Sequence, residues 1–423
     1  MTPPSPGPPR PPPLPHQRET AANTRTRMLA RVAPRDQTGR VAAMVSCGVL
    51  ILMFAMFGLL CAGLNVLVPL AMSPFWTLAS GIVAIAFGLP HVVIILWLDR
   101  NEQEPWWVLL MAFLWGAVMA TGLSMVGNTV FGLLATGLVG DPMIGQALTA
   151  SLSAPPVEEL TKGAAVAAIY LFFRRDLDNV LDGLIYGALV GMGFAMMENF
   201  VYYTSPFLEG SETAVTDWFQ LVFLRGIVTG VGTHWCFTSL TGAGFGLMRV
   251  WRVGCVRYTF PVIGLILAMF AHFAWNTFAG LFVIDPDDTW LTLLVSIPIA
   301  VVFLQLPFVL LVGSIVIFVW THEAALIRRY LGEERKSVVM PGEIDRLVPA
   351  RKRFFRGLYL LFTAQFTAWW HNRTRNKLLI QLAFERWHMD KEEELGAEEE
   401  AGEHARRVVD LRKRLRELGP VAV

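Results

Sequence analysis

The sequence predicts an all-α, polytopic transmembrane helix bundle of about eight spans, with an N-terminal arm and a helical C-terminal tail. Hydrophobic residues make up 54% of the chain, charged residues make up 16% and mean hydropathy is +0.49, which excludes an ordinary soluble domain. Charge is also segregated, because residues 41–320 contain only eight Lys and Arg, whereas residues 321–423 contain 20. We therefore expect a membrane domain at 41–320 between an arm at 1–40 and a tail at 321–423.

The arm opens with a Pro-rich tract and continues with polar sequence interrupted by Arg. Such a composition cannot bury enough apolar surface to fold, so residues 1–40 are expected to be disordered. The apolar stretch that follows is too deep in the chain and too long for a secretory signal, so we interpret the arm as a permanent segment.

Eight apolar stretches follow the arm, and each is long enough to cross a bilayer as a helix. Their expected bounds are about 42–71, 75–98, 106–138, 146–173, 180–204, 217–249, 258–284 and 290–320. The loops between them carry Lys and Arg on one side only. Since cytoplasmic loops are enriched in basic residues, we expect a multi-pass cell-membrane protein with both termini in the cytoplasm.

The tail mixes basic and apolar residues between Arg351 and Trp387. This pattern is typical of an amphipathic helix on the inner leaflet, where anionic lipid head groups attract Lys and Arg. No motif or aromatic-interleaved basic patch points to nucleic acid, which we exclude as a partner.

The fourth apolar stretch contains three ionisable residues, Glu158, Glu159 and Lys162. Ionisable residues within a membrane helix are rare and by default indicate a functional site. At 3.6 residues per turn Lys162 faces Glu158 (i, i+4) and Glu159 (i, i+3), so one ammonium can balance both carboxylates. Pro155 and Pro156 precede them, and we expect the helix to break or open there. The alternative interpretation is a structural ion pair between helices.

The fifth stretch contains Glu198 and Asn199. No basic residue lies within a turn of Glu198, so its charge must be balanced from another helix or suppressed by protonation. Asn199 is either a supporting site residue or a polar contact between helices. Gly187, Gly191 and Gly193 form a flat surface on which we expect a neighbouring helix to approach closely.

Two histidines lie in the middle of further stretches, His234 in the sixth and His272 in the seventh. Each has a small polar residue four positions later, Thr238 and Asn276, on the same helical face. His91 in the second stretch is interpreted as an ordinary core residue, because single histidines in apolar helices usually are.

The ionisable residues of the fourth to seventh stretches are expected at similar depths in the membrane. The rise of 1.5 Å per residue places the carboxylates and imidazoles of the fourth to seventh stretches at similar levels, roughly 18–27 Å from the span ends. We therefore predict one active site built by four helices, with Glu158, Glu159, Glu198, His234, His272 and Asn276 as its catalytic candidates and with Lys162 and Asn199 supporting them.

Such a site can activate water by general acid–base chemistry. With Glu158 or Glu159 as the base, His272 and Asn276 would hold the water and stabilise an oxyanion. The same side chains also suit zinc, for which Glu159, Glu198, His234 and His272 are the candidate ligands, so a zinc route and a metal-free route both remain open. The absence of H-E-x-x-H excludes a zincin-like protease.

These motifs resemble the PrsW family of intramembrane proteases, related to the CAAX prenyl proteases. The family patterns E-E-x-x-K, F-x-x-x-E-N and H-x-x-x-D correspond here to 158–162, 194–199 and 272–276, and the acidic loop 98–106 resembles its D-R-x-E-x-E-P-W segment. Asn276 departs from the usual Asp, which favours a water-holding role over a metal-ligand role. The resemblance covers roughly residues 45–320.

The resemblance implies peptide-bond hydrolysis within the membrane, with Glu158 as the catalytic base. It also implies a membrane-protein substrate, for example a membrane-anchored regulator such as an anti-sigma factor. One alternative is a proton- or ion-coupled transporter that uses the midplane Glu and His residues, although the sequence shows no repeated halves. Another is a non-catalytic scaffold in which polar residues join the helices.

Overall fold

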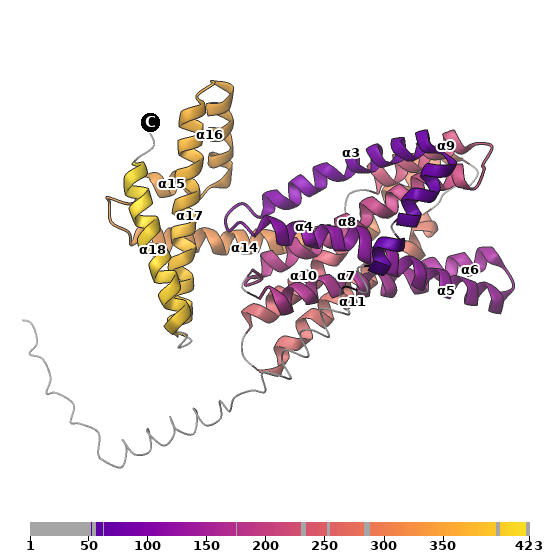
Figure 1. Cartoon of the computed structure of the whole chain (residues 1–423), viewed down its shortest axis with the longest axis horizontal. Helices are drawn as coiled ribbons and strands as arrows, with labels where there is room; N and C mark the ends of the chain where they lie inside the picture. Colours follow the sequence, from indigo (N-terminus) through magenta and orange to yellow (C-terminus); the bar gives the residue numbers. More distant parts are fainter. Residues whose placement is uncertain are drawn as a thin grey trace, which may run out of the picture. The chain divides into compact units, whose positions relative to one another are not determined.

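The structure is a computed structural model that describes residues 52, 56–61, 63–174, 176–229, 234–251, 254–282, 288–394 and 398–419. Every regular element among these residues is a helix, which confirms the predicted all-α class (Figure 1). The arm expected at 1–40 lies outside the described residues.

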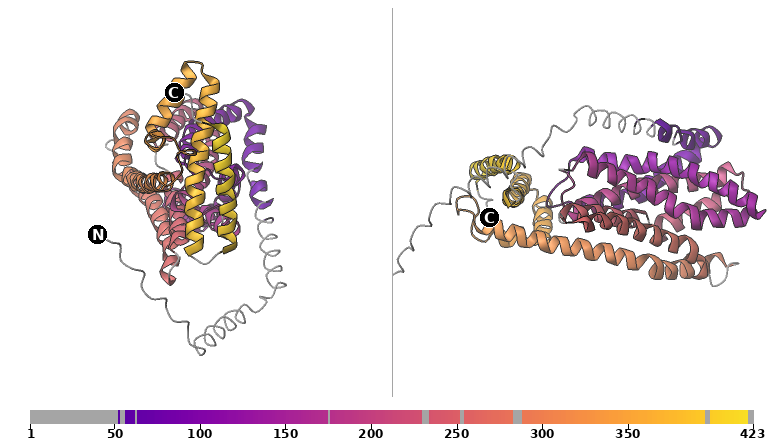
Figure 2. Two further views of the ribbon diagram at one scale, coloured as in Figure 1. Left: turned by 90° about the vertical axis from the view of Figure 1, so that its left-hand side faces the viewer. Right: turned by 90° about the horizontal axis from the view of Figure 1, so that it is seen from below.

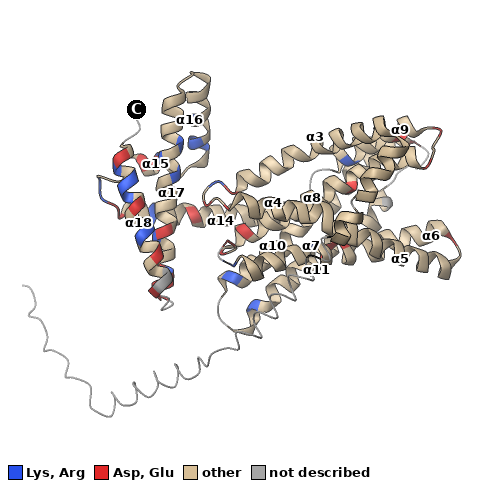
Figure 3. Cartoon of the chain, viewed as in Figure 1, with Lys and Arg blue, Asp and Glu red and all other residues tan. Residues whose placement is uncertain are grey.

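The first group of helices is apolar and carries few charged residues (Figure 3), and its members run roughly side by side in the right-hand view of Figure 2. Its α-helices are α3 Pro74–Leu98, α4 Trp106–Leu114, α5 Thr121–Val139, α6 Pro142–Leu148, α7 Ala154–Phe172, α8 Val180–Leu208, α9 Ala214–Leu221, α10 His234–Val250, α11 Thr259–Phe278, α12 Thr289–Leu291, α13 Ile297–Ala300 and α14 Leu306–Gly332.

Wider or tighter turns join several of these helices. The π-helical turns are η1 Trp115–Ala120, η2 Thr149–Ser153, η3 Val222–Val228, η6 Thr292–Ser296 and η7 Val301–Gln305, and the 3₁₀ turns are η4 Cys255–Tyr258 and η5 Ala279–Phe282. Because π-helical turns admit an extra residue, they change which face of a helix its later residues occupy.

Five of the helical segments are long and apolar enough to cross a membrane, so the count of about eight is not confirmed. They are Pro74–Leu98, Trp106–Val139, Val180–Leu208, Cys255–Phe278 and Thr289–Gly332. The fourth expected span contains α7, a helix with three ionisable residues. The sixth is described as two shorter helical pieces. The first is represented by the shorter apolar helix Met56–Met72, which includes residues outside those described.

Helix α8 is the centre of the membrane domain, with most of its side chains buried. It begins at a capping box, in which the Asn179 side chain accepts from the Asp182 backbone N–H at 3.1 Å and the Asp182 carboxylate accepts from the Asn179 N–H at 3.0 Å. This reciprocal cap starts the helix at Val180 and so sets the depth of every later residue along it.

Glycine faces bring α8 and α10 into backbone contact. A Cβ atom at Gly187 would meet the Thr238 carbonyl, and one at Gly191 would meet the His234 carbonyl. The expected close approach of a helix is therefore found at these two glycines. Gly193 differs from the expectation, because it faces Phe113 of α4 on another side of α8.

The tail is a helical unit with its own core. Its elements are α15 Glu343–Leu347, α16 Ala350–Phe362, α17 Phe366–Glu394 and α18 Glu398–Leu418, and most charged residues of the drawn chain gather on them (Figure 3). The single amphipathic helix expected at 351–387 is instead α16 and most of α17. Part of α17 is buried, including Leu379 and Leu382, because it packs on α14 and α18. The aromatic residues of α16, such as Phe354 and Phe362, are exposed.

We predict that Gly187→Ala lowers the free energy of unfolding by about 1–3 kcal/mol, because the added methyl group must push α8 away from α10. Gly137→Ala in α5 is the matched control, since a Cβ atom there meets nothing within 4 Å. It should leave stability unchanged or slightly higher, given the better helix propensity of Ala. Thermal unfolding in detergent measures both. Equal effects of the two substitutions would contradict the close packing.

Candidate functional site

Helix α7 enters the site through a widened turn. The π-helical η2 leads directly into α7, which has Pro155 and Pro156 in its first turn. The expected break at these prolines is wrong, because proline is tolerated in the first turn of a helix, where its missing N–H is not needed. The chain therefore continues as a helix, and Glu158, Glu159 and Lys162 follow within about two turns.

The Lys162 ammonium lies at the centre of the cluster and is fully buried. Its Nζ atom is 3.2 Å from Glu158 Oε2, 2.9 Å from Glu159 Oε1 and 2.9 Å from His234 Nδ1. The expectation that one ammonium serves both carboxylates agrees with these distances. An ammonium has three N–H groups, so all of them are used, and a buried charge is stabilised only when it is paired in this way.

Glu159 has no uncommitted oxygen. Oε1 accepts from Lys162 and lies 3.2 Å from His272 Nδ1, while Oε2 accepts from the Thr238 hydroxyl at 2.9 Å. Since a carboxylate only accepts, His272 must donate from Nδ1, which leaves Nε2 facing the cluster. Glu159 thus positions side chains of α10 and α11 on α7.

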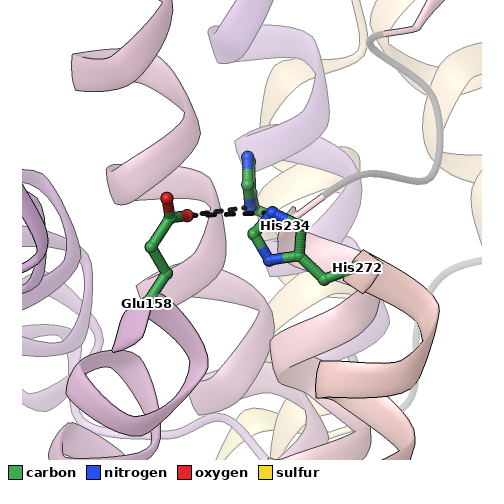
Figure 4. A group of neighbouring side chains, drawn as sticks. All are labelled: Glu158, His234 and His272. Atoms are coloured by element: carbon green, nitrogen blue, oxygen red, sulfur yellow. Dashed lines mark ion pairs between the residues drawn. The ribbon is translucent and has the colours of Figure 1, made fainter. Parts of the chain in front are cut away.

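Glu158 is more open. Its Oε1 atom accepts a long hydrogen bond of 3.3 Å from Asn128 of α5. Its Oε2 atom lies 3.9 Å from His272 Nε2 and 4.0 Å from His234 Nδ1, and Figure 4 shows the carboxylate pointing at both imidazoles. These separations exceed a direct hydrogen bond but match two groups that share one water, roughly 4–5 Å apart.

His234 links this cluster to Glu198 of α8. Lys162 can only donate, so His234 Nδ1 accepts and Nε2 donates to Glu198 Oε2 at 3.0 Å. Glu198 also forms an ion pair with Arg225 of η3, whose Nε donates to Asn199 Oδ1 at 2.8 Å. The countercharge expected from another helix is therefore Arg225.

The remaining predicted residues lie farther out. Asn276 donates from its amide to the Ala150 carbonyl of η2 at 2.8 Å, which ties α11 to the turn before α7. His91 bonds its own helix at the Phe87 carbonyl, as an ordinary core histidine does. Sequence reasoning missed Arg225, although an Arg inside an apolar stretch is the signal that singled out Lys162. It also missed Asn128, which no motif marked.

Three side chains of the cluster fit a metal ion by type and spacing. Glu158, His234 and His272 offer ligand atoms within 4.8 Å of one another, and two imidazoles with one carboxylate are a common zinc set. A zinc ion bound through His234 Nδ1 would have to displace Lys162, because that nitrogen has a single lone pair. Of the ligand candidates taken from sequence, Glu159 is engaged with Thr238, Lys162 and His272.

Comparison with known proteins gives two matches. The family described as PrsW family intramembrane metalloprotease matches residues 104–312, a range that contains the whole cluster and leaves the tail outside. The chain is also 28% identical over 196 residues to Protease PrsW of Geobacillus kaustophilus (strain HTA426), covering 44% of this chain and 77% of the relative. No solved structure matches the chain.

We predict that Glu198 and Arg225 are energetically coupled by roughly 1–3 kcal/mol in a double-mutant cycle with Glu198→Gln and Arg225→Gln. Each single change leaves a partly buried charge without its partner, whereas the double change removes both charges. Thermal unfolding of the four proteins in detergent gives the coupling. The exposed pair Lys413 and Glu417 of α18 is the control and should give a value near zero. Additive effects at Glu198 and Arg225 would contradict the assignment.

Proposed function

Because the chain is a PrsW-family intramembrane protease, acting on a membrane protein within the bilayer, we propose that it hydrolyses a peptide bond with water activated by Glu158 and held by His272. The observation that supports this proposal is the unequal engagement of the two adjacent glutamates. Glu159 has three close partners at 2.9–3.2 Å. Within the described part of the chain, Glu158 accepts only from Lys162 at 3.2 Å and from Asn128 at 3.3 Å, and its Oε2 faces both imidazoles across a distance that one water spans.

In this mechanism the water donates one hydrogen bond to Glu158 Oε2 and the other to His272 Nε2, which directs its oxygen lone pairs at the substrate carbonyl. The new O–C bond forms as the water proton passes to Glu158. The same carboxyl group then donates that proton to the leaving amide nitrogen as the C–N bond breaks. Glu158 therefore ends each cycle ionised, as it began.

The remaining residues of the cluster position Glu158 and His272. Glu159 fixes the His272 tautomer from Nδ1, and Thr238 and Lys162 fix Glu159. His234 and Glu198 form the side of the cluster nearest Arg225. We assign Asn276 to positioning of η2 through Ala150.

If zinc is bound, Glu158, His234 and His272 would hold it, and it would supply a water of lowered pKa and polarise the peptide carbonyl. Glu159 would then hold the His272 ring in place through Nδ1, as outer carboxylates do in metal sites.

The substrate we propose is a membrane-anchored regulator of the anti-sigma-factor kind, as the motif resemblance implies. An apolar cavity of about 450 Å³ supports an apolar substrate segment, because Met196, Met197 and Phe200 of α8 line it. We propose that side chains of the substrate's transmembrane segment enter there. The transporter alternative is not favoured, since both matches are to proteases.

We also propose that both termini are cytoplasmic and that the tail contacts anionic lipid. The exposed Phe354, Phe355 and Phe362 of α16 support this, because Arg and Lys residues are interleaved with them.

We predict that Glu158→Gln lowers cleavage of a single-span substrate in liposomes by at least about 10³-fold, since the substitution removes the base. It should lower the unfolding temperature less than Glu159→Gln does, because the longer contact of Lys162 is lost and the Gln oxygen can still accept from it. Glu159→Gln should lower both activity and unfolding temperature, because it breaks a saturated buried pair with Lys162. Gel analysis of cleavage and thermal unfolding measure the two effects.

His91→Ala is the control for a membrane histidine outside the cluster and should retain full activity. Wild-type activity in Glu158→Gln would remove the proposed base. The same result in His272→Ala would remove the water-holding role.

A further inference from the structure

A second group of carboxylate and imidazole side chains lies outside the membrane cluster. Glu102 comes from the loop between α3 and α4, Asp178 from the loop before α8, and His388 from α17 of the tail. Their ligand atoms lie within 4.8 Å of one another although the residues are far apart in the sequence. The family match ends at residue 312, so His388 of the tail lies outside it.

The distances within this group suit a shared cation. His388 Nε2 lies 3.0 Å from Glu102 Oε1 and 3.5 Å from Asp178 Oδ2. Atoms bound to one metal ion at 2.0–2.2 Å are roughly 3.0–3.5 Å apart in tetrahedral or octahedral arrangements. The corresponding separations in the membrane cluster are 3.9 and 4.0 Å, so the second group is the more compact of the two.

Two oxygen atoms of the group have no hydrogen-bond partner in the part of the chain that the structure describes. They are Glu102 Oε2 and Asp178 Oδ1, and both are buried. A buried acceptor without a partner is costly, and an ion is one of its ordinary explanations. An ion pair with a protonated His388 would use the other oxygen of each carboxylate and leave these two unexplained.

The group places two carboxylates beside one imidazole, and a bound cation would offset the repulsion between the carboxylates.

We propose that Glu102, Asp178 and His388 bind a divalent transition-metal ion that bridges the tail and the membrane domain. One imidazole with two carboxylates favours zinc or manganese over magnesium and calcium, which prefer oxygen ligands alone. Partial exposure of all three side chains leaves room for water to complete the coordination.

Direct contacts already hold the tail against the same loop. Lys377 donates to Gln103 at 3.0 Å, and Arg353 donates to Asn101 at 2.7 Å. The metal would strengthen this existing contact between the tail and the loop. The loop is also connected to α8, the helix that carries Glu198, because Glu104 accepts from the Tyr186 hydroxyl at 2.7 Å.

The test uses the full-length protein in detergent, loaded with Zn²⁺, dialysed, and analysed for zinc by mass spectrometry. We expect His388→Ala and Asp178→Asn each to retain one zinc fewer per chain than the wild type. Zn²⁺ should also raise the unfolding temperature of the wild type more than that of either variant. Excess Mg²⁺ should not displace the ion.

His371→Ala, on the same helix, is the matched control and should retain the wild-type zinc content. The comparison is repeated with Glu158→Gln in every protein, so that zinc in the membrane cluster contributes equally to each. Equal zinc in the wild type, His388→Ala and Asp178→Asn would overturn the proposal, as would a His388→Ala protein that loses stability equally with and without Zn²⁺.

Discussion

The organisation of the membrane domain depends on one buried ammonium group. Lys162 has no exposed surface, and its three N–H groups serve Glu158, Glu159 and His234. A lysine charge within a bilayer is tolerated only when it is paired, so α10 and α7 must lie close enough to supply the partners. Gly163 of α7 allows a close approach to α10, since a Cβ atom there would lie 3.4 Å from Thr241.

Two adjacent glutamates acquire different chemistry from this arrangement. Because they lie one residue apart, about 100° around the helix, Glu159 points into the contact between α10 and α11 while Glu158 points toward Asn128 and the two imidazoles. Both side chains are buried, but Glu159 is held by structural contacts whereas Glu158 faces the imidazoles. The two histidines differ in the same way. His272 has its Nε2 atom facing Glu158, whereas both ring nitrogens of His234 are bonded, one to Lys162 and the other to Glu198.

Sequence spacing predicted the side-chain contacts within one helix. The contacts between helices depend on tertiary packing, which the spacing does not reveal. The (i, i+3) and (i, i+4) pairing of Lys162 follows from 3.6 residues per turn and needed no coordinates. The charge of Glu198 predicted a partner on another helix, but only packing identifies it as Arg225. Pro155 lies in the first turn of α7, directly after the widened turn η2, where a break was expected. π-helical turns leave no strong sequence signal. The contacts between the tail and loop 99–105 could not be predicted either, because the spacing of apolar residues carries no information about them.

The site depends on Glu158 Oε2, which accepts from Lys162 and faces both imidazoles across a distance that one water spans. An experimental structure in a lipid nanodisc, at a resolution that shows ordered solvent, tests this arrangement most directly. We expect Glu158 Oε2 close to 4 Å from His272 Nε2, with one solvent molecule or ion bound between them and Lys162. A Glu158 side chain turned away from His272, with Glu159 exposed in its place, would contradict it.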